Sequence, residues 1–377
     1  MRVEQKRWNG RSGWCLGQND LSADAQWVLA FGGRDIVSDP ARFDEIRKMY
    51  PKARIVCSTT AGEILPSGSI VDESIALTAV HLEKASINVH QENIAELKDS
   101  QLVGERLGTA LQQDDLTHVF VISDGHHING DALVRGLKKN LGEQTAITGG
   151  LAGDGTLFEK TLVGMDAVPK EGNVVAVGLY GQDIKVGFGC VGGWNPFGPM
   201  RKVTRSSGNL LHELDEKNAL ELYKTYLGNY AKDLPAFARF FPLFVSIGND
   251  PPVARTILSV DEKNKTMTFA GEIPEGASVQ IMYANFDHII DGAEHAAKST
   301  LKEQNNYEFA ILVSCVGRRL VLGPHTEEEV NRVKQVLGEQ TKITGFYSYG
   351  EISPLIKGAA CSLHNQTMSV TAFKEIM

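Results

Sequence analysis

Two stretches of sequence decide the fold: LGEQTAITG at Leu141 to Gly149, and LGEQTKITG at Leu337 to Gly345. They differ at a single position, although a large part of the chain separates them. In each copy, apolar residues at helical spacing end in Leu-Gly, and an Ile-Thr-Gly strand pattern follows. The same join between a helix and a strand therefore occurs twice, which indicates internal duplication of one supersecondary unit.

The residues around each copy extend the unit to a strand, a loop, a helix and a second strand. An earlier third copy is weaker and shares only AGEI with the YGEI of the last copy. The first strands are expected at Trp27 to Gly32, His118 to Gly125 and Phe309 to Gly317, and the helices at Pro40 to Tyr50, Asn129 to Leu141 and Thr326 to Leu337. Thr326 and Glu329 have the spacing of a capping box at the start of the last helix.

A further apolar run follows each unit, at Ser74 to Val80, Asn173 to Tyr180 and Thr367 to Phe373. Strands that alternate with helices favour sheets covered by helices. The sequence therefore predicts an α/β protein in which internally repeated strand-loop-helix-strand units form mixed β-sheets flanked by helices. At 377 residues, two domains are expected, and we place them at 1–228 and 229–377. Because the repeats resemble one another, the two parts are expected to share sheets.

Composition narrows the class of function. The formal net charge of -8 argues against nucleic acid as a partner, since phosphates require clustered Lys and Arg. No apolar run approaches the roughly 20 residues of a membrane-spanning helix, and no signal peptide is evident, so a cytoplasmic protein without membrane insertion is expected. The five cysteines lack a CxxC spacing, which is typical of reduced thiols rather than a metal site.

Polar and aromatic residues gather in loops that directly follow the predicted strands. Ligands of open α/β sheets bind at the carboxyl ends of strands. Arg318 has the geometry to grip a carboxylate, and Glu63 or Glu351 could hold an ammonium group. The expected ligand-binding residues are Thr60, Glu63, Arg318, Tyr347, Tyr349, Glu351, His364 and Asn365.

The motifs STTAGEI, ITGGLAGDG, SCVGR, GFYSYGEI and LHNQT together resemble FIST proteins, over roughly Asp24 to Phe373. The resemblance implies a FIST N domain followed by a FIST C domain, and a sensory protein that binds small ligands such as amino acids in signal transduction. The free-standing bacterial form is similar to nitric-oxide-sensing haemoproteins of the NosP type. That similarity alone implies a haem cofactor and a partner histidine kinase.

The residues themselves leave several functions open. The chain has no GxSxG, HExxH or Walker A motif, which favours a binding sensor over an enzyme. His288 and His295 are too far apart on a helix to share one metal ion, although either could be a haem axial ligand, so the metal-binding residues stay unknown. A protein-interaction module is one alternative. Another is a thiol-dependent enzyme, with Cys315 activated by Arg318 and with His364 near.

Overall fold

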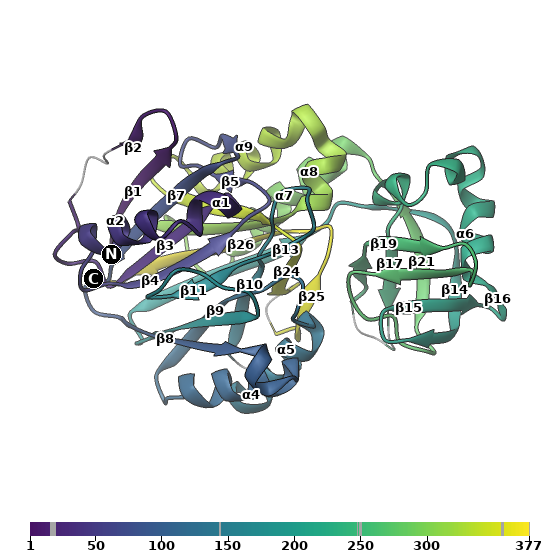
Figure 1. Cartoon of the computed structure of the whole chain (residues 1–377), viewed down its shortest axis with the longest axis horizontal. Coiled ribbons are helices and arrows are strands. Elements are labelled where there is room, and N and C mark those ends of the chain that lie inside the picture. Colours follow the sequence, from purple (N-terminus) through teal and green to yellow (C-terminus); the bar gives the residue numbers. More distant parts are fainter. Residues whose placement is uncertain (16–19, 143–144, 247, 249–250, 356–357, 377) are drawn as a thin grey trace.

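The computed structural model describes residues 1–15, 20–142, 145–246, 248, 251–355 and 358–376. Glu143 and Gln144 of the first ninemer lie outside the described residues. Figure 1 shows a large body made of three sheets and a smaller lobe beside it, drawn in teal and green. The α/β class predicted from the sequence, with mixed sheets and flanking helices, is confirmed.

The body contains three copies of one four-stranded unit. The first two copies consist of β1 (Arg2–Asn9), β3 (Trp27–Gly32), β4 (Arg54–Thr59) and β7 (Ser74–His81), and of β8 (Ser86–Asn93), β9 (Leu116–Ser123), β10 (Ala146–Leu151) and β12 (Asn173–Tyr180). The third consists of β13 (Ile184–Val191), β22 (Phe309–Cys315), β23 (Lys342–Ser348) and β26 (Met368–Glu375). The other strands of each unit confirm those predicted from the sequence, whereas β1, β8 and β13 were not predicted.

All three units have the same strand order. The orders in space are β4-β3-β7-β1, β10-β9-β12-β8 and β23-β22-β26-β13. The two strands joined by the crossover helix are parallel in each case, and the remaining neighbours are antiparallel. The duplication visible in the ninemer is therefore a triplication of the whole sheet.

The three sheets exchange strands in a cycle. The segment after β4 forms β5 (Glu63–Ile64), which pairs with β23 of the third unit. The segment after β10 forms β11 (Val163–Met165), which pairs with β4 of the first unit. The segment after β23 forms β24 (Gly350–Pro354), which pairs with β10 of the second unit. Each loop that follows a parallel strand thus crosses into another unit, and this brings the three loops to the same end of the body. Short strands extend the edges: β2 (Gly13–Cys15), β6 (Ile70–Val71) and β25 (Cys361–His364).

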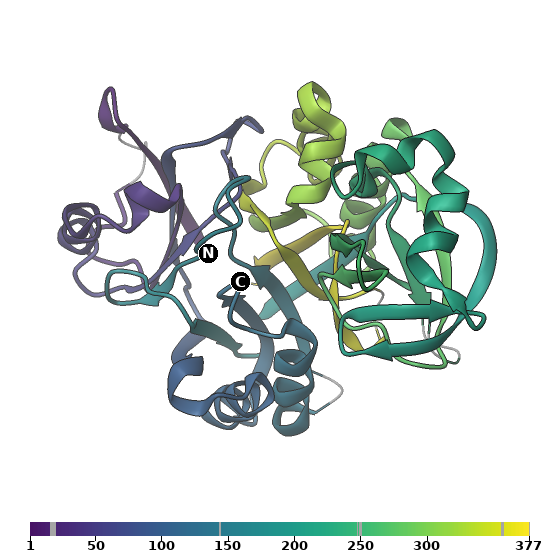
Figure 2. The same cartoon turned by 45° about the vertical axis from the view of Figure 1, so that its right-hand side comes forward.

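The inner faces of the three sheets share one apolar core. Trp27 of the first unit meets Phe120 of the second at 6.2 Å and Phe373 of the third at 6.4 Å between ring centroids. The outer faces carry the helices, which Figures 1 and 2 show on different sides of the body. These helices are α2 (Pro40–Met49), α4 (Ser100–Leu111), α5 (Gly130–Leu141), α7 (Phe286–Thr300) and α9 (Thr326–Leu337), with the short α1 (Arg34–Val37), α3 (Ile94–Leu97), α8 (Val316–Leu322) and η3 (Gly323–His325).

The last glycine of each ninemer has a structural reason. A Cβ atom on Gly149 would collide with the carbonyl oxygen of Val121, and one on Gly345 with that of Leu312. Val121 and Leu312 are the partners of these glycines in the parallel strand pairs. The neighbouring strand therefore leaves no room for a side chain at this position, and the conserved part of the duplication is scaffold.

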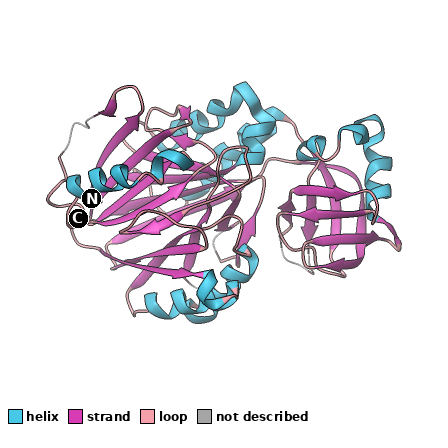
Figure 3. Cartoon of the chain, viewed as in Figure 1, coloured by secondary structure: helices cyan, strands magenta, loops and turns pink. Residues whose placement is uncertain are grey.

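The lobe is inserted between β13 and α7 of the third unit and has an apolar core of its own. Figure 3 shows that it is mostly strand, with helix along its outer side. Its elements are β14 (Asn195–Ser207), β15 (Leu210–Leu214), β16 (Lys217–Asn218), α6 (Ala219–Leu227), η1 (Gly228–Asp233), η2 (Ala236–Phe240), β17 (Leu243–Ser246), β18 (Val253–Arg255), β19 (Ile257–Asp261), β20 (Thr266–Phe269) and β21 (Ser278–Tyr283). The boundary suggested at residue 228 falls inside this lobe, at the start of η1.

Candidate functional site

A cavity of about 790 Å³ lies where the loops after β3, β4, β10 and β22 converge. All three units contribute to it, because each loop follows the carboxyl end of a parallel strand. We call it the strand-end cavity. The residues that line it are Gly33, Arg34, Asp35, Ile36, Thr60, Glu63, Asp72, Glu73, Asp154, Gly155, Thr156, Leu157, Val316, Arg319, Leu320, Gly323 and Thr326.

Asp154 joins the three units at this cavity. Its carboxylate accepts a hydrogen bond from the Tyr349 hydroxyl, which follows β23, and one from Arg34, which follows β3, at 3.2 Å. It also accepts hydrogen bonds from the backbone amides of Phe158, Glu159 and Lys160. Burial alone would raise the pKa of Asp154, but the Tyr349 hydroxyl and these amides hold it below its ordinary value. Asp154 is therefore a carboxylate, and it organises the loop that follows it.

Glu63 is a second acid in the wall, and its protonation state differs from that of Asp154. The Thr60 hydroxyl donates to its Oε1 at 2.6 Å, and the Ser74 hydroxyl donates to its Oε2 at 2.8 Å. Glu63 is only 1% exposed, and burial raises the pKa of its carboxyl to about 8. Burial therefore favours the protonated form of Glu63 at neutral pH.

The other arginine of the cavity is Arg319. It forms a two-pronged ion pair with Asp72, with both N–O distances 2.7 Å, and donates to the carbonyl oxygen of Ala61 at 2.6 Å. Both cavity arginines are thus already oriented by acids. The full set of charged side chains in the wall is Arg34 and Arg319 against Asp35, Glu63, Asp72, Glu73 and Asp154. Even with Glu63 neutral, negative groups outnumber positive ones, which suits an ammonium group, while each guanidinium can bind a carboxylate.

Three of the residues predicted from the sequence lie at this cavity. Thr60 and Glu63 line it, and Tyr349 reaches it through Asp154. The Tyr349 ring also stacks on Phe158, with the centroids 4.7 Å apart. Asp154 belongs to a glycine loop that the sequence singled out, but Arg34 and Arg319 carry no sequence signal of their own. Only the convergence of the three units shows their role.

Arg318 and Tyr347 lie beneath the cavity, in a closed network around Glu329. Arg318 donates to Glu329 Oε2 at 2.9 and 2.7 Å, and both side chains are 0% exposed. The Tyr347 hydroxyl donates to Glu329 Oε1 at 2.8 Å. The predicted capping box is wrong: α9 begins at Thr326 with His325 as its N-cap residue, the Thr326 hydroxyl donates back to the carbonyl oxygen of Gly323, and Glu329 is engaged by Arg318. Adjacent helical residues point about 100° apart, so Arg319 faces the cavity while Arg318 faces the interior.

Glu351 is the counterpart of Glu63 in the third unit. The Ser348 hydroxyl donates to it at 2.6 Å, three residues back, as Thr60 does for Glu63. The Thr367 hydroxyl donates to its other oxygen at 2.9 Å. Glu351 is fully buried, does not line the cavity, and its pKa is raised by burial to about 8. It holds the third unit together as Glu63 does the first.

His364 and Asn365 lie elsewhere, near the lobe. The His364 Nε2 bonds the Ser353 carbonyl oxygen at 2.8 Å, and burial lowers its pKa to about 4, so the ring is neutral. The Asn365 side-chain oxygen accepts a long hydrogen bond, 3.5 Å, from the backbone amide of Thr256 in the lobe. The eight predicted residues therefore divide between the strand-end cavity, the buried interior and the contact between lobe and body.

The surroundings of Cys315 and of the α7 histidines bear on the thiol-dependent enzyme and on metal binding. Cys315 is buried, and burial raises the pKa of its thiol well above the ordinary value, which is opposite to the shift that a reactive thiolate needs. His288 and His295 both lie exposed on α7, and His288 bonds the Asn195 side chain at 2.7 Å. Across the part of the chain that the structure describes, no group of three or more His, Cys, Asp or Glu side chains could hold a metal ion.

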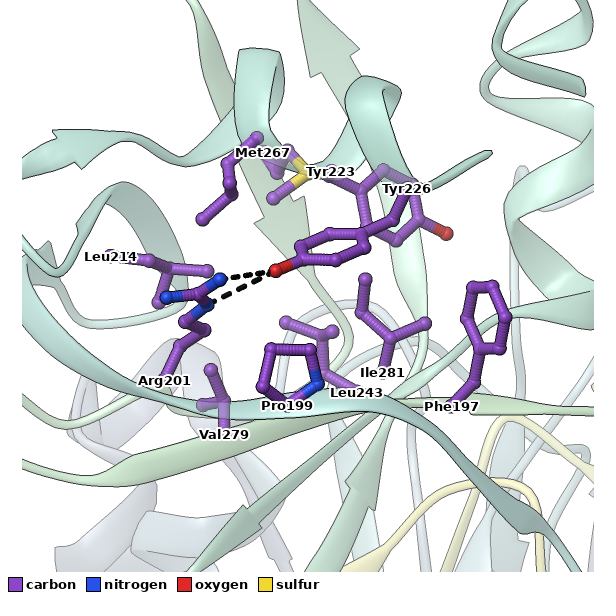
Figure 4. A pocket seen from close by; sticks show the side chains of 11 residues that line it. Phe197, Pro199, Arg201, Leu214, Tyr223, Tyr226, Leu243, Met267, Val279 and Ile281 are labelled. Atoms are coloured by element: carbon purple, nitrogen blue, oxygen red, sulfur yellow. Dashed lines mark hydrogen bonds between the residues drawn. The ribbon is translucent and has the colours of Figure 1, made fainter. Parts of the chain in front are cut away.

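The lobe contains a much smaller hollow. Figure 4 shows a hollow in its core, where the Arg201 guanidinium donates to the Tyr226 hydroxyl beside Pro199 and Leu243. The volume of this hollow is about 10 Å³, roughly the room that one water molecule needs. A small-molecule ligand therefore does not fit inside the lobe core.

The fold and the cavity together define a three-sheet α/β protein with a charged cavity between its repeats. The FIST N domain family matches residues 26–217 and the FIST C domain family matches residues 219–354. The chain therefore belongs to the FIST family, whose domains are sensory and bind small ligands in signalling proteins.

Other comparisons add little. No curated protein matches the sequence. A cyanuric acid hydrolase from A. caulinodans is similar at a TM-score of 0.38 and 9% sequence identity, with 100% of this chain and 99% of that chain covered. Among the described residues, no helix has both the length and the apolar character needed to cross a membrane.

Proposed function

We propose that this FIST protein senses a small zwitterionic molecule of the amino-acid type, bound in the strand-end cavity, and passes the signal to a partner protein. The observation that carries the proposal is the wall of the cavity, where Arg34 and Arg319 lie among an excess of acids. A guanidinium binds the carboxylate of such a ligand, and Asp154 or Glu73 binds its ammonium group.

The contacts of Asp154 supply a route for the signal. A ligand ammonium that pairs with Asp154 competes with Arg34. The Arg34 guanidinium then keeps only its exposed partners, Glu159 and Asp35, and can turn to the ligand carboxylate. Asp154 also holds the amides of Phe158 and Glu159, and Leu157 in the same loop is 56% exposed at the cavity. Occupation of the cavity therefore biases the conformation of an exposed apolar loop, which is a surface that a partner can recognise.

Haem is less well supported as the ligand. The wall of the strand-end cavity contains no His, Cys, Met or Tyr to act as an axial ligand, and its acids oppose the two propionates of a haem. His364 touches another cavity, but its ring is 1% exposed and one nitrogen already bonds Ser353. The strand-end cavity therefore favours an amino acid over haem as its ligand. Nitric-oxide sensing and a histidine kinase partner stay predictions from resemblance. A cytoplasmic, non-catalytic protein stays a prediction from composition and motifs.

The test is a thermal-shift screen of the purified chain against the free amino acids, each with its N-acetyl and amide derivatives. We expect at least one free amino acid to raise the melting temperature, and its two blocked derivatives to fail, because each lacks one of the charges that the cavity binds. Arg34→Gln should abolish the shift. Arg205→Gln, which breaks an exposed ion pair with Glu213 in the lobe, is the matched control and should retain it.

Two outcomes contradict the proposal. One is equal stabilisation by a free amino acid and its N-acetyl derivative. The other is a Soret band with stoichiometric haem uptake when haem is added to the apoprotein, together with no response to any amino acid. The second result would indicate that the ligand is haem.

A further inference from the structure

A second cavity, of about 380 Å³, lies where the lobe meets the body. We call it the junction cavity. The body contributes α5 and the hairpin of β24 and β25, and the lobe contributes β17, β18 and the segment around Glu272. Ligand sites are favoured at domain interfaces, and their volumes run from about 300 to 1,000 Å³. The location and the size of the junction cavity both fit a binding site.

The charges of the junction cavity are already paired with one another across the interface. Arg255 of the lobe pairs with Asp131 of the body at 3.1 Å, and Arg135 of the body pairs with Glu272 of the lobe at 3.1 Å. Arg255 also donates to the carbonyl oxygens of Leu363 and Glu272. Unlike in the strand-end cavity, the two arginines and two acids among the described residues balance. A charged ligand would therefore have to break an ion pair without meeting an excess of opposite charge, so the cavity favours an uncharged one.

Apart from Ser362 and His364, the remaining described residues of the wall are apolar or glycine. Val245, Val253, Pro251 and Pro274 face it from the lobe, and Leu355, Ala359 and Ala360 face it from the body. His364 also contributes to the wall. Because its Nε2 bonds a carbonyl oxygen, which only accepts, that nitrogen carries the proton and Nδ1 holds a lone pair.

The lone pair of His364 is an unused acceptor. Nδ1 is buried and has no hydrogen-bond partner among the described residues. An unpaired buried acceptor is costly, and a donor delivered by a ligand would remove that cost. Since the ring is 1% exposed, the junction has to open slightly for this contact to form, which links binding to the position of the lobe.

We propose that the junction cavity is a second binding site, separate from the strand-end cavity, for a small uncharged molecule with an apolar body and one N–H or O–H donor. Its ligand fills the space between Val253 and Ala359 and donates to His364. By doing so it fixes the lobe against the body. This inference does not depend on the identity of the ligand in the strand-end cavity.

The test uses four naphthalene probes and isothermal titration calorimetry on the full chain: naphthol, methoxynaphthalene, naphthoate and naphthylmethylammonium. Only naphthol is both uncharged and a donor. We expect naphthol to bind at least about tenfold more tightly than each of the others, since one buried hydrogen bond or one broken ion pair accounts for such a ratio. Equal binding of a charged probe, or no heat from naphthol up to its solubility, overturns the proposal.

Variants then place the site. Val253→Trp fills the junction cavity and should weaken naphthol binding about tenfold or more. Val260→Trp, at a partly buried position on the lobe strand β19 that does not line the cavity, is the matched control and should leave binding unchanged. Unaltered binding in Val253→Trp overturns the proposal. If Val253→Trp does not fold, the relative affinities of the four probes for the unmodified chain decide whether the proposal stands. Asp154→Asn should leave naphthol binding intact, which separates this site from the strand-end cavity.

Discussion

The two buried carboxyls, Glu63 and Glu351, predict an unusual dependence of stability on pH. Each is almost fully buried, and each has a pKa raised by burial to about 8 from an ordinary value of 4.5. Between these two values the folded chain keeps a proton that the unfolded chain has lost. Folding therefore becomes less favourable as the pH rises through this window, and the stabilisation is complete only below pH 4.5.

The magnitude follows from proton linkage. One such group changes the free energy of unfolding by about 1.4 kcal/mol per pH unit. From pH 5.5 to 7.5 each carboxyl therefore removes about 2.7 kcal/mol. Gln resembles the protonated carboxyl in shape and hydrogen bonding, but it does not titrate. From pH 5.5 to 7.5, the unfolding free energy of Glu63→Gln or Glu351→Gln, relative to that of the wild type, should therefore rise by about 2.7 kcal/mol.

The assay is urea unfolding at pH 5.5, 6.5 and 7.5, in which the difference in unfolding free energy between variant and wild type is followed. Glu339→Gln is the control, because the Glu339 side chain is 78% exposed, and its difference should not vary with pH. A difference for Glu63→Gln that stays constant across the series refutes the reasoning, since it means that Glu63 is ionised in the folded chain.

Three further predictions concern the interior. Phe373→Ala removes a ring whose centroid lies 5.7 Å from that of Phe309, where the three sheets meet. The free energy of unfolding in urea should fall by about 3–5 kcal/mol. A fall below about 1 kcal/mol would mean that the sheets do not share a core. Arg318→Ala leaves Glu329 buried without its cation and should destabilise the chain by about 3–5 kcal/mol; an unchanged unfolding midpoint would argue against the buried pair. Cys315 should react with iodoacetamide no faster than a free model thiol, as its raised pKa and burial require, and faster labelling by mass spectrometry would revive the thiol-enzyme reading.

Much of the fold could be predicted from the sequence, because helix and strand periodicity is local. The helix at Thr326–Leu337 and the strand at Trp27–Gly32 have the limits that the residue pattern suggests. The ninemer revealed two of the three units, since Gly149 and Gly345 are fixed by contact with a neighbouring strand. The exchange of strands between units was not predictable, because strands as short as β5 carry no pattern that names their partner.

The site was predicted only in part. Thr60 and Glu63 could be found because their loop directly follows a strand, and the carboxyl ends of parallel strands are where ligands bind. Arg318 was preferred to Arg319 because the one-letter pattern does not show which of two adjacent arginines faces inward. Arg34 could not be found at all, since its role depends on Asp154, which comes from a different unit.

The most direct test of the central claim is a crystal structure of the chain with the amino acid that gives the largest thermal shift. We expect density in the strand-end cavity, with the ligand carboxylate on Arg34 or Arg319 and its ammonium group on Asp154. Density for the amino acid in the junction cavity instead, with the Arg34 to Asp154 ion pair unchanged, would contradict the claim.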